Sequence, residues 1–94
     1  MTYYALEYTT IENFANRRAP LRQEHLRLVS DAHARGELLL AGALGDPPDG
    51  ALLIFRSESP EAPERFARAD PYVTSGLVKD WRVRPWTVVI GGQP

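Results

Sequence analysis

The sequence predicts an α+β domain whose strands and helices follow the order β-α-β-β-α-β. Three observations predict it. The hydrophobic period alternates between about two and about 3.6 residues, two apolar runs flank a dense turn, and no internal repeat is visible. A chain of 94 residues can bury one thin core, so we expect a single domain over residues 1–94.

The first half of the chain predicts one strand and one helix. Residues Thr2 to Thr9 alternate in polarity, with Tyr4 and Tyr8 on one face, as expected of a half-buried strand. The stretch from Pro20 to Arg35 has helical periodicity, and Gly36 stands where a helix commonly stops. A strand followed by a helix is therefore expected before the middle of the chain.

The middle of the chain predicts a β-hairpin. Leu38 to Ala43 and Ala51 to Arg56 are apolar runs of strand length. Between them the segment Gly45 to Gly50, with the sequence GDPPDG, combines glycine, proline and aspartate, which are typical of turns.

The last third predicts a second helix and a fourth strand. Ser59 followed by Pro60 is typical of a helix start, and the helix should end before Pro71. Lys79 to Ile90 alternates as a strand but changes parity at Pro85. We therefore expect a bulge or an edge position at that proline.

This element order is the split β-α-β, or ferredoxin-like, arrangement, in which two helices cover one face of a four-stranded antiparallel sheet. The two central runs are apolar on both parities, so the second face of the sheet also needs cover. We expect a second copy of the chain to supply it, as a homodimer packed sheet to sheet. Ligand pockets would then lie between sheet and helices or at the interface, and larger assemblies stay open.

Composition and charge argue against several classes of function. The chain has 11 Lys and Arg against 12 Asp and Glu, so nucleic acid and anionic membranes are not expected as partners. Cysteine is absent, which excludes disulfides, thiolate zinc sites and cysteine nucleophiles. The start MTYYALEY is unlike a signal peptide, and no long apolar run is present, so we expect a cytoplasmic protein.

A helical wheel places His25 in the middle of the apolar stripe of the first predicted helix. Arg22 lies on the shoulder of this stripe, as does Arg18 if the helix extends that far. A buried imidazole needs partners for both ring nitrogens, because an unpaired group costs roughly 1–3 kcal/mol. A satisfied core histidine explains the position, while the two arginines favour a site for an anion.

Asp70 stands at the end of the second predicted helix, where the helix dipole disfavours a carboxylate. It is suited both to capping a short following turn and to holding an imidazole N–H. Tyr8 and Tyr72 are candidates for lining an aromatic pocket, although core packing explains them equally. His33 lies roughly 12 Å from His25 along a helix, too far to share one metal ion, so we expect neither a metal nor a cofactor.

Several motifs together resemble the YCII-related family. They are Arg22-x-x-His25, Gly36-Glu37-Leu38, Ala41-Gly42, Ser59 leading into Ala69-Asp70-Pro71-Tyr72, Gly76-Leu77 and the strand Val83 to Trp86. The resemblance spans Tyr3 to about Val88. It implies the dimeric α+β barrel superfamily, in agreement with the topology above. It also implies a His–Asp acid/base pair, which falls on His25 and Asp70.

The resemblance implies a small cofactor-free lyase or isomerase, since one branch resembles dehalogenating or muconolactone-isomerase-like enzymes. His25 would act as general acid or base, Asp70 would hold its ring, and Arg22 and Arg18 would bind an anionic small molecule. Tyr8 and Tyr72 are further substrate-binding candidates. The alternative is a non-catalytic module that binds a metabolite or only forms a structural dimer. The sequence does not decide whether the chain is an enzyme.

Overall fold

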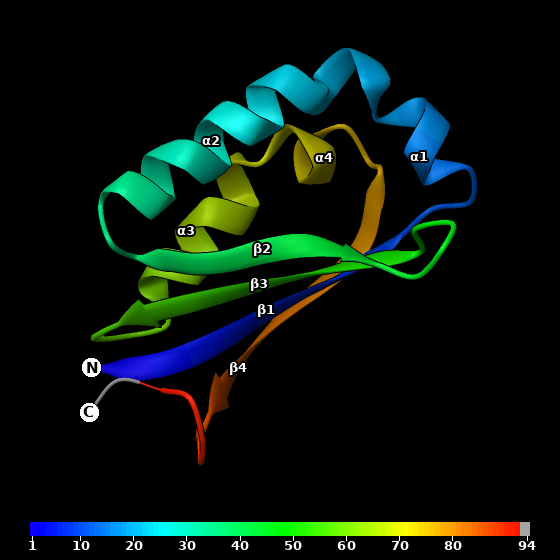
Figure 1. The fold of residues 1–94 in the computed structure, drawn as a ribbon. Helices are drawn as coiled ribbons and strands as arrows, with labels where there is room; N and C mark the ends of the chain where they lie inside the picture. The colour runs from blue at the N-terminus through cyan, green and yellow to red at the C-terminus, as the bar shows by residue number, and fades with distance from the viewer. Residues whose placement is uncertain (93–94) are drawn as a thin grey trace.

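The computed structural model describes residues 1–92, and its elements follow the predicted order (Figure 1). The strands are β1 (Thr2–Thr10), β2 (Leu38–Leu44), β3 (Gly50–Ser57) and β4 (Val78–Trp86). The longer helices are α2 (Arg22–Ala34) and α3 (Glu61–Ala69). The short ones are α1 (Phe14–Arg17), the 3₁₀ turn η1 (Ala19–Leu21) and α4 (Pro71–Thr74).

The four strands form one antiparallel sheet in the order β2-β3-β1-β4, and the helices all lie on one of its faces (Figure 1). In the centre of the sheet Leu6 of β1 lies between Leu53 of β3 and Val83 of β4. This confirms the predicted ferredoxin-like fold. Because β1 is a central strand, one end of it lies directly beneath the short helices α1 and α4 (Figure 1).

The core lies between the helices and the sheet. Alternate residues of β1 and β3, including Leu6, Leu53 and Phe55, are buried under α2 and α3. From α3, Phe66 packs edge-on against Phe55 with ring centroids 5.5 Å apart. The period-two pattern of the strands and the apolar stripe of α3 therefore meet in one cluster.

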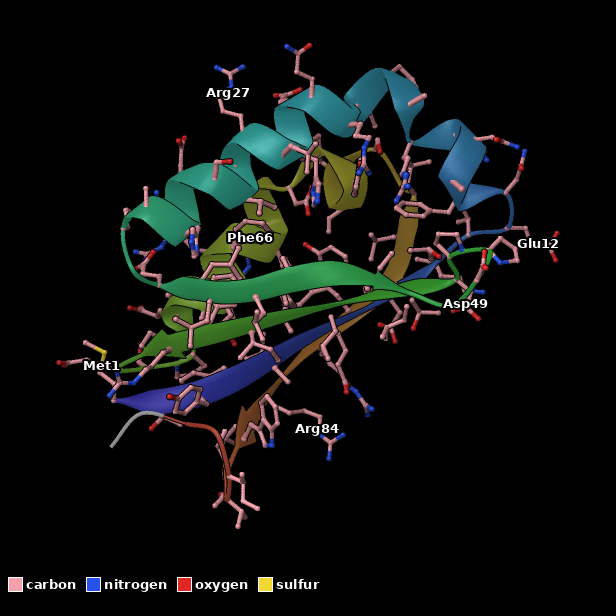
Figure 2. All side chains as sticks on the ribbon, viewed as in Figure 1. Met1, Glu12, Arg27, Asp49, Phe66 and Arg84 are labelled. Atoms are coloured by element: carbon pink, nitrogen blue, oxygen red, sulfur yellow. The ribbon has the colours of Figure 1, made fainter. Side chains whose placement is uncertain are left out.

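The other face of the sheet has no helix against it. Arg84 points away on this side, whereas Arg27 of α2 points outward on the helix side (Figure 2). Among its apolar side chains Leu40 is 69% exposed and Trp86 is 46% exposed. Glu7 forms ion pairs with Arg82 and Arg84 on this face. The open face thus combines exposed apolar groups with charges of both signs.

The first helix differs from the prediction over Pro20 to Arg35. It begins only at Arg22, after the separate elements α1 and η1, which the sequence analysis missed. Pro20 has no N–H to continue an α-helix through this region. Asn13, with φ of 61°, starts α1 from the left-handed conformation that asparagine tolerates. Arg18 therefore caps α1 and does not extend α2.

The predicted bulge at Pro85 is absent, but the predicted edge position is confirmed. Pro85 pairs in register with Tyr4, and the irregularity between these strands lies at Thr9 and Thr10 of β1. An edge strand accepts proline because its outward N–H has no partner to lose. The strand spans Val78–Trp86, so it ends four residues before the predicted end at Ile90.

The second helix begins at Glu61, one residue after the predicted start, and Pro60 occupies the cap position. The Ser59 hydroxyl still accepts a hydrogen bond from the Glu61 N–H at 3.3 Å. Within residues 1–92 no helix is long and apolar enough to span a membrane.

Candidate active site

Asp70 occupies the junction between α3 and α4. It is fully buried, and its Oδ1 accepts a hydrogen bond from the Tyr72 backbone N–H at 3.0 Å. Pro71 follows at the first position of α4, where its missing N–H costs nothing. The predicted capping role of Asp70 is confirmed, and this cap fixes the carboxylate within the core.

The same carboxylate contacts the imidazole of His25. His25 Nδ1 lies 2.9 Å from Asp70 Oδ1 and 3.1 Å from Oδ2. Asp70 Oδ2 also accepts a hydrogen bond from the Tyr8 hydroxyl at 2.8 Å. Because the carboxylate oxygens are acceptors here, Nδ1 carries the ring proton and donates it. The other ring nitrogen, Nε2, is then left as the acceptor.

The side chain of His25 is only 14% exposed, and its ring is held on a second side by Tyr72. The two rings stack with centroids 3.9 Å apart and planes 14° from parallel. Phe14 of α1 packs edge-on against Tyr72 at 5.2 Å. The hydrogen bond to Asp70 on one edge and the stacked Tyr72 ring on one face together restrict the orientation of the imidazole.

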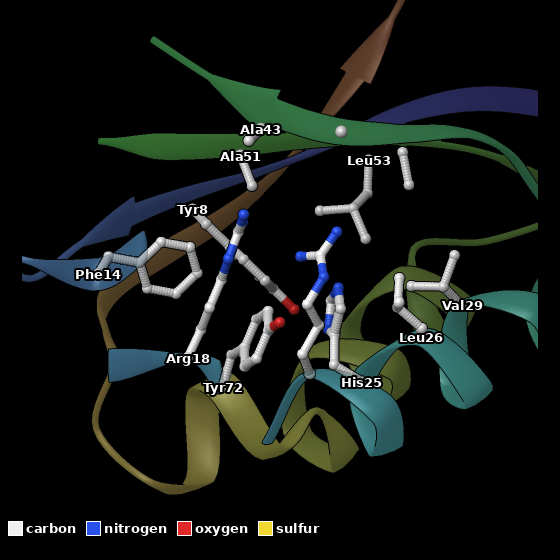
Figure 3. Close-up of a pocket in the computed structure, with 13 residues that line it drawn as sticks. Tyr8, Phe14, Arg18, His25, Leu26, Val29, Ala43, Ala51, Leu53 and Tyr72 are labelled. Carbon is white, nitrogen blue, oxygen red and sulfur yellow. The ribbon is translucent and has the colours of Figure 1, made fainter. Parts of the chain in front are cut away.

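A cavity of about 210 Å³ opens beside these rings, between the helices and the sheet (Figure 3). Figure 3 shows His25 reaching into it from α2, with Ala43, Ala51 and Leu53 on the strands opposite. The lining residues are Tyr8, Phe14, Arg18, Arg22, His25, Leu26, Val29, Ala41, Gly42, Ala43, Ala51, Leu53 and Tyr72. The arginines and the histidine of this lining therefore come from the helix side, whereas the sheet contributes Tyr8 and small or apolar residues.

The two arginines reach the cavity from different elements. Arg22 is the first residue of α2, whereas Arg18 caps α1 and places its guanidinium 5.5 Å from the centre of the Phe14 ring. The predicted spacing along one helix is therefore wrong for Arg18. The chain nevertheless brings both cations to the same cavity wall, which suits an anionic ligand.

Two tyrosine hydroxyls at this site have perturbed acidity. Burial raises the pKa of Tyr8 well above its usual value, and the charge of Asp70 and the hydrogen bond to it raise it further. Burial also raises the pKa of Tyr72, while the nearby guanidinium groups of Arg22 and Arg18 partly offset this rise. Both hydroxyls therefore keep their protons at neutral pH, and that of Tyr8 is already donated to Asp70.

We expect the stability of the protein to fall at alkaline pH because of Tyr8. Its hydroxyl stays protonated in the folded chain but ionises near pH 10 when unfolded. The contribution of the Tyr8 hydroxyl to the free energy of unfolding is thus complete below pH 10. Above pH 10 this contribution is lost by up to roughly 1.4 kcal/mol per pH unit. Urea unfolding of Tyr8→Phe should show lower stability at neutral pH and a shallower alkaline decline. Parallel curves for the two proteins would contradict this.

The structure brings the predicted site residues together. His25, Arg22, Arg18, Tyr72 and Tyr8 all line the cavity, and Asp70 lies behind His25. The hydroxyl of Tyr8 is engaged with Asp70, so its contact with a substrate stays a prediction.

Sequence reasoning missed Phe14 and the small residues on the sheet side. The single useful signal was Asn13, which tolerates the turn that starts α1.

His33 lies apart from this site. Its Nδ1 donates a hydrogen bond to the Leu38 carbonyl at 2.8 Å, close to the start of β2. Within residues 1–92 no group of three or more histidine, cysteine, aspartate or glutamate side chains is placed to hold a metal ion.

The fold and the site define a class of protein: a ferredoxin-like α+β chain with a carboxylate–imidazole pair beside a cavity between helices and sheet. Within that class the chain belongs to the YCII-related family, whose domain model matches residues 1–87. This confirms the resemblance drawn from the motifs.

Relatives in two bacteria support this assignment. The chain is 31% identical over 96 residues to an uncharacterised protein of Haemophilus influenzae, covering 93% of this chain and 98% of that protein. It is 34% identical over 82 residues to protein YciI of Escherichia coli, covering 78% of this chain and 84% of the relative.

Solved structures share the fold at low sequence identity. The chlorohydroxyhydroquinone dehydrochlorinase TftG of Burkholderia phenoliruptrix superposes with a TM-score of 0.74 at 19% identity, covering 90% of this chain and 93% of TftG. An antibiotic biosynthesis monooxygenase superposes with a TM-score of 0.55 at 17% identity, covering 95% and 99% of the two chains. At these identities the likeness concerns the fold alone.

Proposed function

We propose that this chain is a small cofactor-free lyase or isomerase that acts on an anionic small molecule through His25 and Asp70. One observation carries the proposal. Asp70 holds His25 Nδ1 at 2.9 Å, which leaves Nε2 as the nitrogen available to a molecule in the cavity. An imidazole fixed in this way is suited to taking up and returning a proton within one turnover.

Each of the surrounding residues has a separate role in the proposed reaction. Asp70 fixes the tautomer and orientation of His25, so that Nε2 is the nitrogen that takes up a proton. Tyr8 donates to Asp70 and keeps that carboxylate in place. Arg22 and Arg18 would stabilise negative charge on a carboxylate, enolate or phenolate oxygen of the substrate. Acid/base chemistry beside a bound anion follows from this layout.

The structural neighbour TftG suggests one reaction of this type. It is a 5-chloro-2-hydroxyhydroquinone dehydrochlorinase, solved in complex with 2,5-dihydroxybenzoquinone. Loss of HCl from a chlorinated trihydroxybenzene moves one proton from a hydroxyl oxygen to the carbon that bears chlorine. Chloride then leaves with the electron pair of the C–Cl bond while a second hydroxyl loses its proton. His25 Nε2 would carry the transferred proton, so no external oxidant or reductant is needed.

A turnover assay tests the proposal. The purified chain is incubated without oxygen with 5-chloro-2-hydroxyhydroquinone, with enolisable lactones and with small 2-oxo carboxylates. Chloride release or isomerisation is followed against a blank without protein. We expect at least one class to react faster than the blank. If members of the panel bind and are recovered unchanged after long incubation, the chain is a binding module and the lyase proposal fails.

We also propose that the chain forms a homodimer through the open face of the sheet. This face exposes Leu40 and Trp86, and it has a hollow of about 270 Å³ lined by apolar residues with Glu7 and Arg84 at its side. Apolar surface next to paired charges of both signs is suited to contact with an identical surface. A second copy would bury the apolar groups that the helices leave uncovered.

Charge reversal on this face should dissociate the dimer. In Arg84→Glu two carboxylates replace the ion pair between Arg84 and Glu7 at the proposed interface, and burying like charges is costly. We expect this variant to sediment as one chain at concentrations where the wild type sediments as two. Arg27→Glu, on the exposed face of α2, is the matched control and should remain a dimer. A wild-type mass of one chain at micromolar concentration would refute the proposal.

A further inference from the structure

The hydroxyl of Tyr72 is the feature of the cavity that the proton-transfer scheme leaves unused. Tyr72 is only 3% exposed, and the Arg22 guanidinium lies within reach to donate to its oxygen, but within the described chain the hydroxyl proton has no acceptor. A buried hydroxyl without a partner is unfavourable, so native structures usually supply one. Figure 3 shows this hydroxyl pointing into the cavity from α4.

The surroundings of this hydroxyl indicate what its partner would be. The guanidinium groups of Arg22 and Arg18 lie close enough to influence it electrostatically. The carboxylate of Asp70 is already occupied by three donors, from Tyr8, His25 and the Tyr72 backbone. The groups near the Tyr72 hydroxyl that remain open to a ligand are therefore donors. The partner that this hydroxyl lacks is expected to be a negatively charged acceptor.

The opposite wall limits the shape of the ligand. Figure 3 shows Ala43 of β2 and Ala51 of β3 on the strands opposite, and Ala41 of β2 also lines the cavity, so small apolar side chains form this wall. The cavity volume of about 210 Å³ is below the roughly 300–1,000 Å³ of pockets that hold drug-sized ligands. A single flat ring suits this space better than a chain or a fused system.

We propose that the Tyr72 hydroxyl, together with Arg22 and Arg18, forms a subsite for the phenolate or enolate oxygen of a single-ring ligand. This inference rests on the proposed function, since it places the substrate oxygen next to the tyrosine ring that stacks on His25. In this subsite Tyr72 donates a hydrogen bond to the ligand. The ring of the ligand lies against Ala41, Ala43 and Ala51.

Binding of 4-nitrophenol tests this subsite without any turnover. The probe is a single ring with one ionisable hydroxyl and a visible absorbance, and titration is done at a pH where it is ionised. We expect the wild type to bind it and Tyr72→Phe to bind it about 10- to 100-fold more weakly, as expected for one hydrogen bond to a charged group. Tyr72→Phe should melt close to the wild-type temperature, because the hydroxyl proton that it removes has no acceptor within the described chain.

Two controls define the result. Tyr4→Phe changes another buried tyrosine that does not line the cavity, and it should bind the probe like the wild type. The methyl ether 4-nitroanisole has the same ring without the charge and should bind much more weakly. Equal binding by Tyr72→Phe and the wild type, or equal affinity for the ether, would overturn the subsite. Because the probe has no leaving group, its binding can succeed even if every turnover assay fails.

Discussion

Replacing His25 with glutamine is expected to slow turnover of an identified substrate by about 10²- to 10⁴-fold, the usual contribution of a positioned general acid or base. Glutamine retains a polar side chain of similar reach toward Asp70 but cannot take up and release a proton near neutral pH. Ligand affinity should change much less, because the arginines that bind the anion are intact. Steady-state kinetics give kcat and KM separately and so distinguish loss of chemistry from loss of binding.

The second histidine of α2 provides the matched control. His33 is exposed and binds only the Leu38 carbonyl, so His33→Gln should leave kcat and KM near their wild-type values. If His25→Gln retained wild-type kcat, the imidazole would not carry the proton, and His25 would be a structural partner of Asp70.

Replacing Asp70 with alanine should destabilise the protein by about 3–5 kcal/mol, because two buried side-chain donors and one helix cap lose their acceptor. The substitution removes the acceptor for the Tyr8 hydroxyl and for His25 Nδ1. It also removes the cap of α4, since the Tyr72 N–H loses its bond. Urea unfolding at neutral pH measures the difference directly.

The isosteric variant Asp70→Asn separates packing from charge. It fills the same volume and can still cap α4, so we expect it to be more stable than Asp70→Ala, yet to lose the acid/base activity of His25. Asp31→Ala, an exposed acid of α2, should change stability by no more than about 0.5 kcal/mol. Should Asp70→Ala prove as stable as the wild type, the buried carboxylate would not hold the site together.

The fold was largely predictable because local patterns and tertiary packing agree. Alternation in β1 and the GDPPDG turn between β2 and β3 specify strands whose order leaves few topologies. What escaped prediction was the region from Asn13 to Leu21, where short helices depend on a left-handed asparagine and on a proline. Such turns are stabilised by tertiary contacts, here the burial of Phe14, that have no periodic signature in the sequence.

The candidate site was only partly predictable for the same reason. His25 and Asp70 were paired through a family resemblance, since 45 residues separate them and no local pattern joins them. Arg18 lies at the end of α1 and not on an extension of α2, yet it lines the same cavity, because the chain turns back over the sheet through α1 and η1 (Figure 1). The hydrogen bond between Tyr8 and Asp70 depends both on the position of β1 in the sheet and on the reach of the tyrosine ring across the core. A sequence pattern does not specify this combination.

The most direct test of the central claim is the tautomer of His25, measured by two-bond ¹H–¹⁵N correlation NMR on the neutral imidazole. We expect a proton on Nδ1, held by Asp70, and a free lone pair on Nε2 facing the cavity. His33, whose Nδ1 donates to a carbonyl, serves as an internal reference and should keep its tautomer in Asp70→Asn. A neutral His25 with its proton on Nε2 would contradict the account, because that nitrogen would then have no lone pair with which to accept a proton from a substrate.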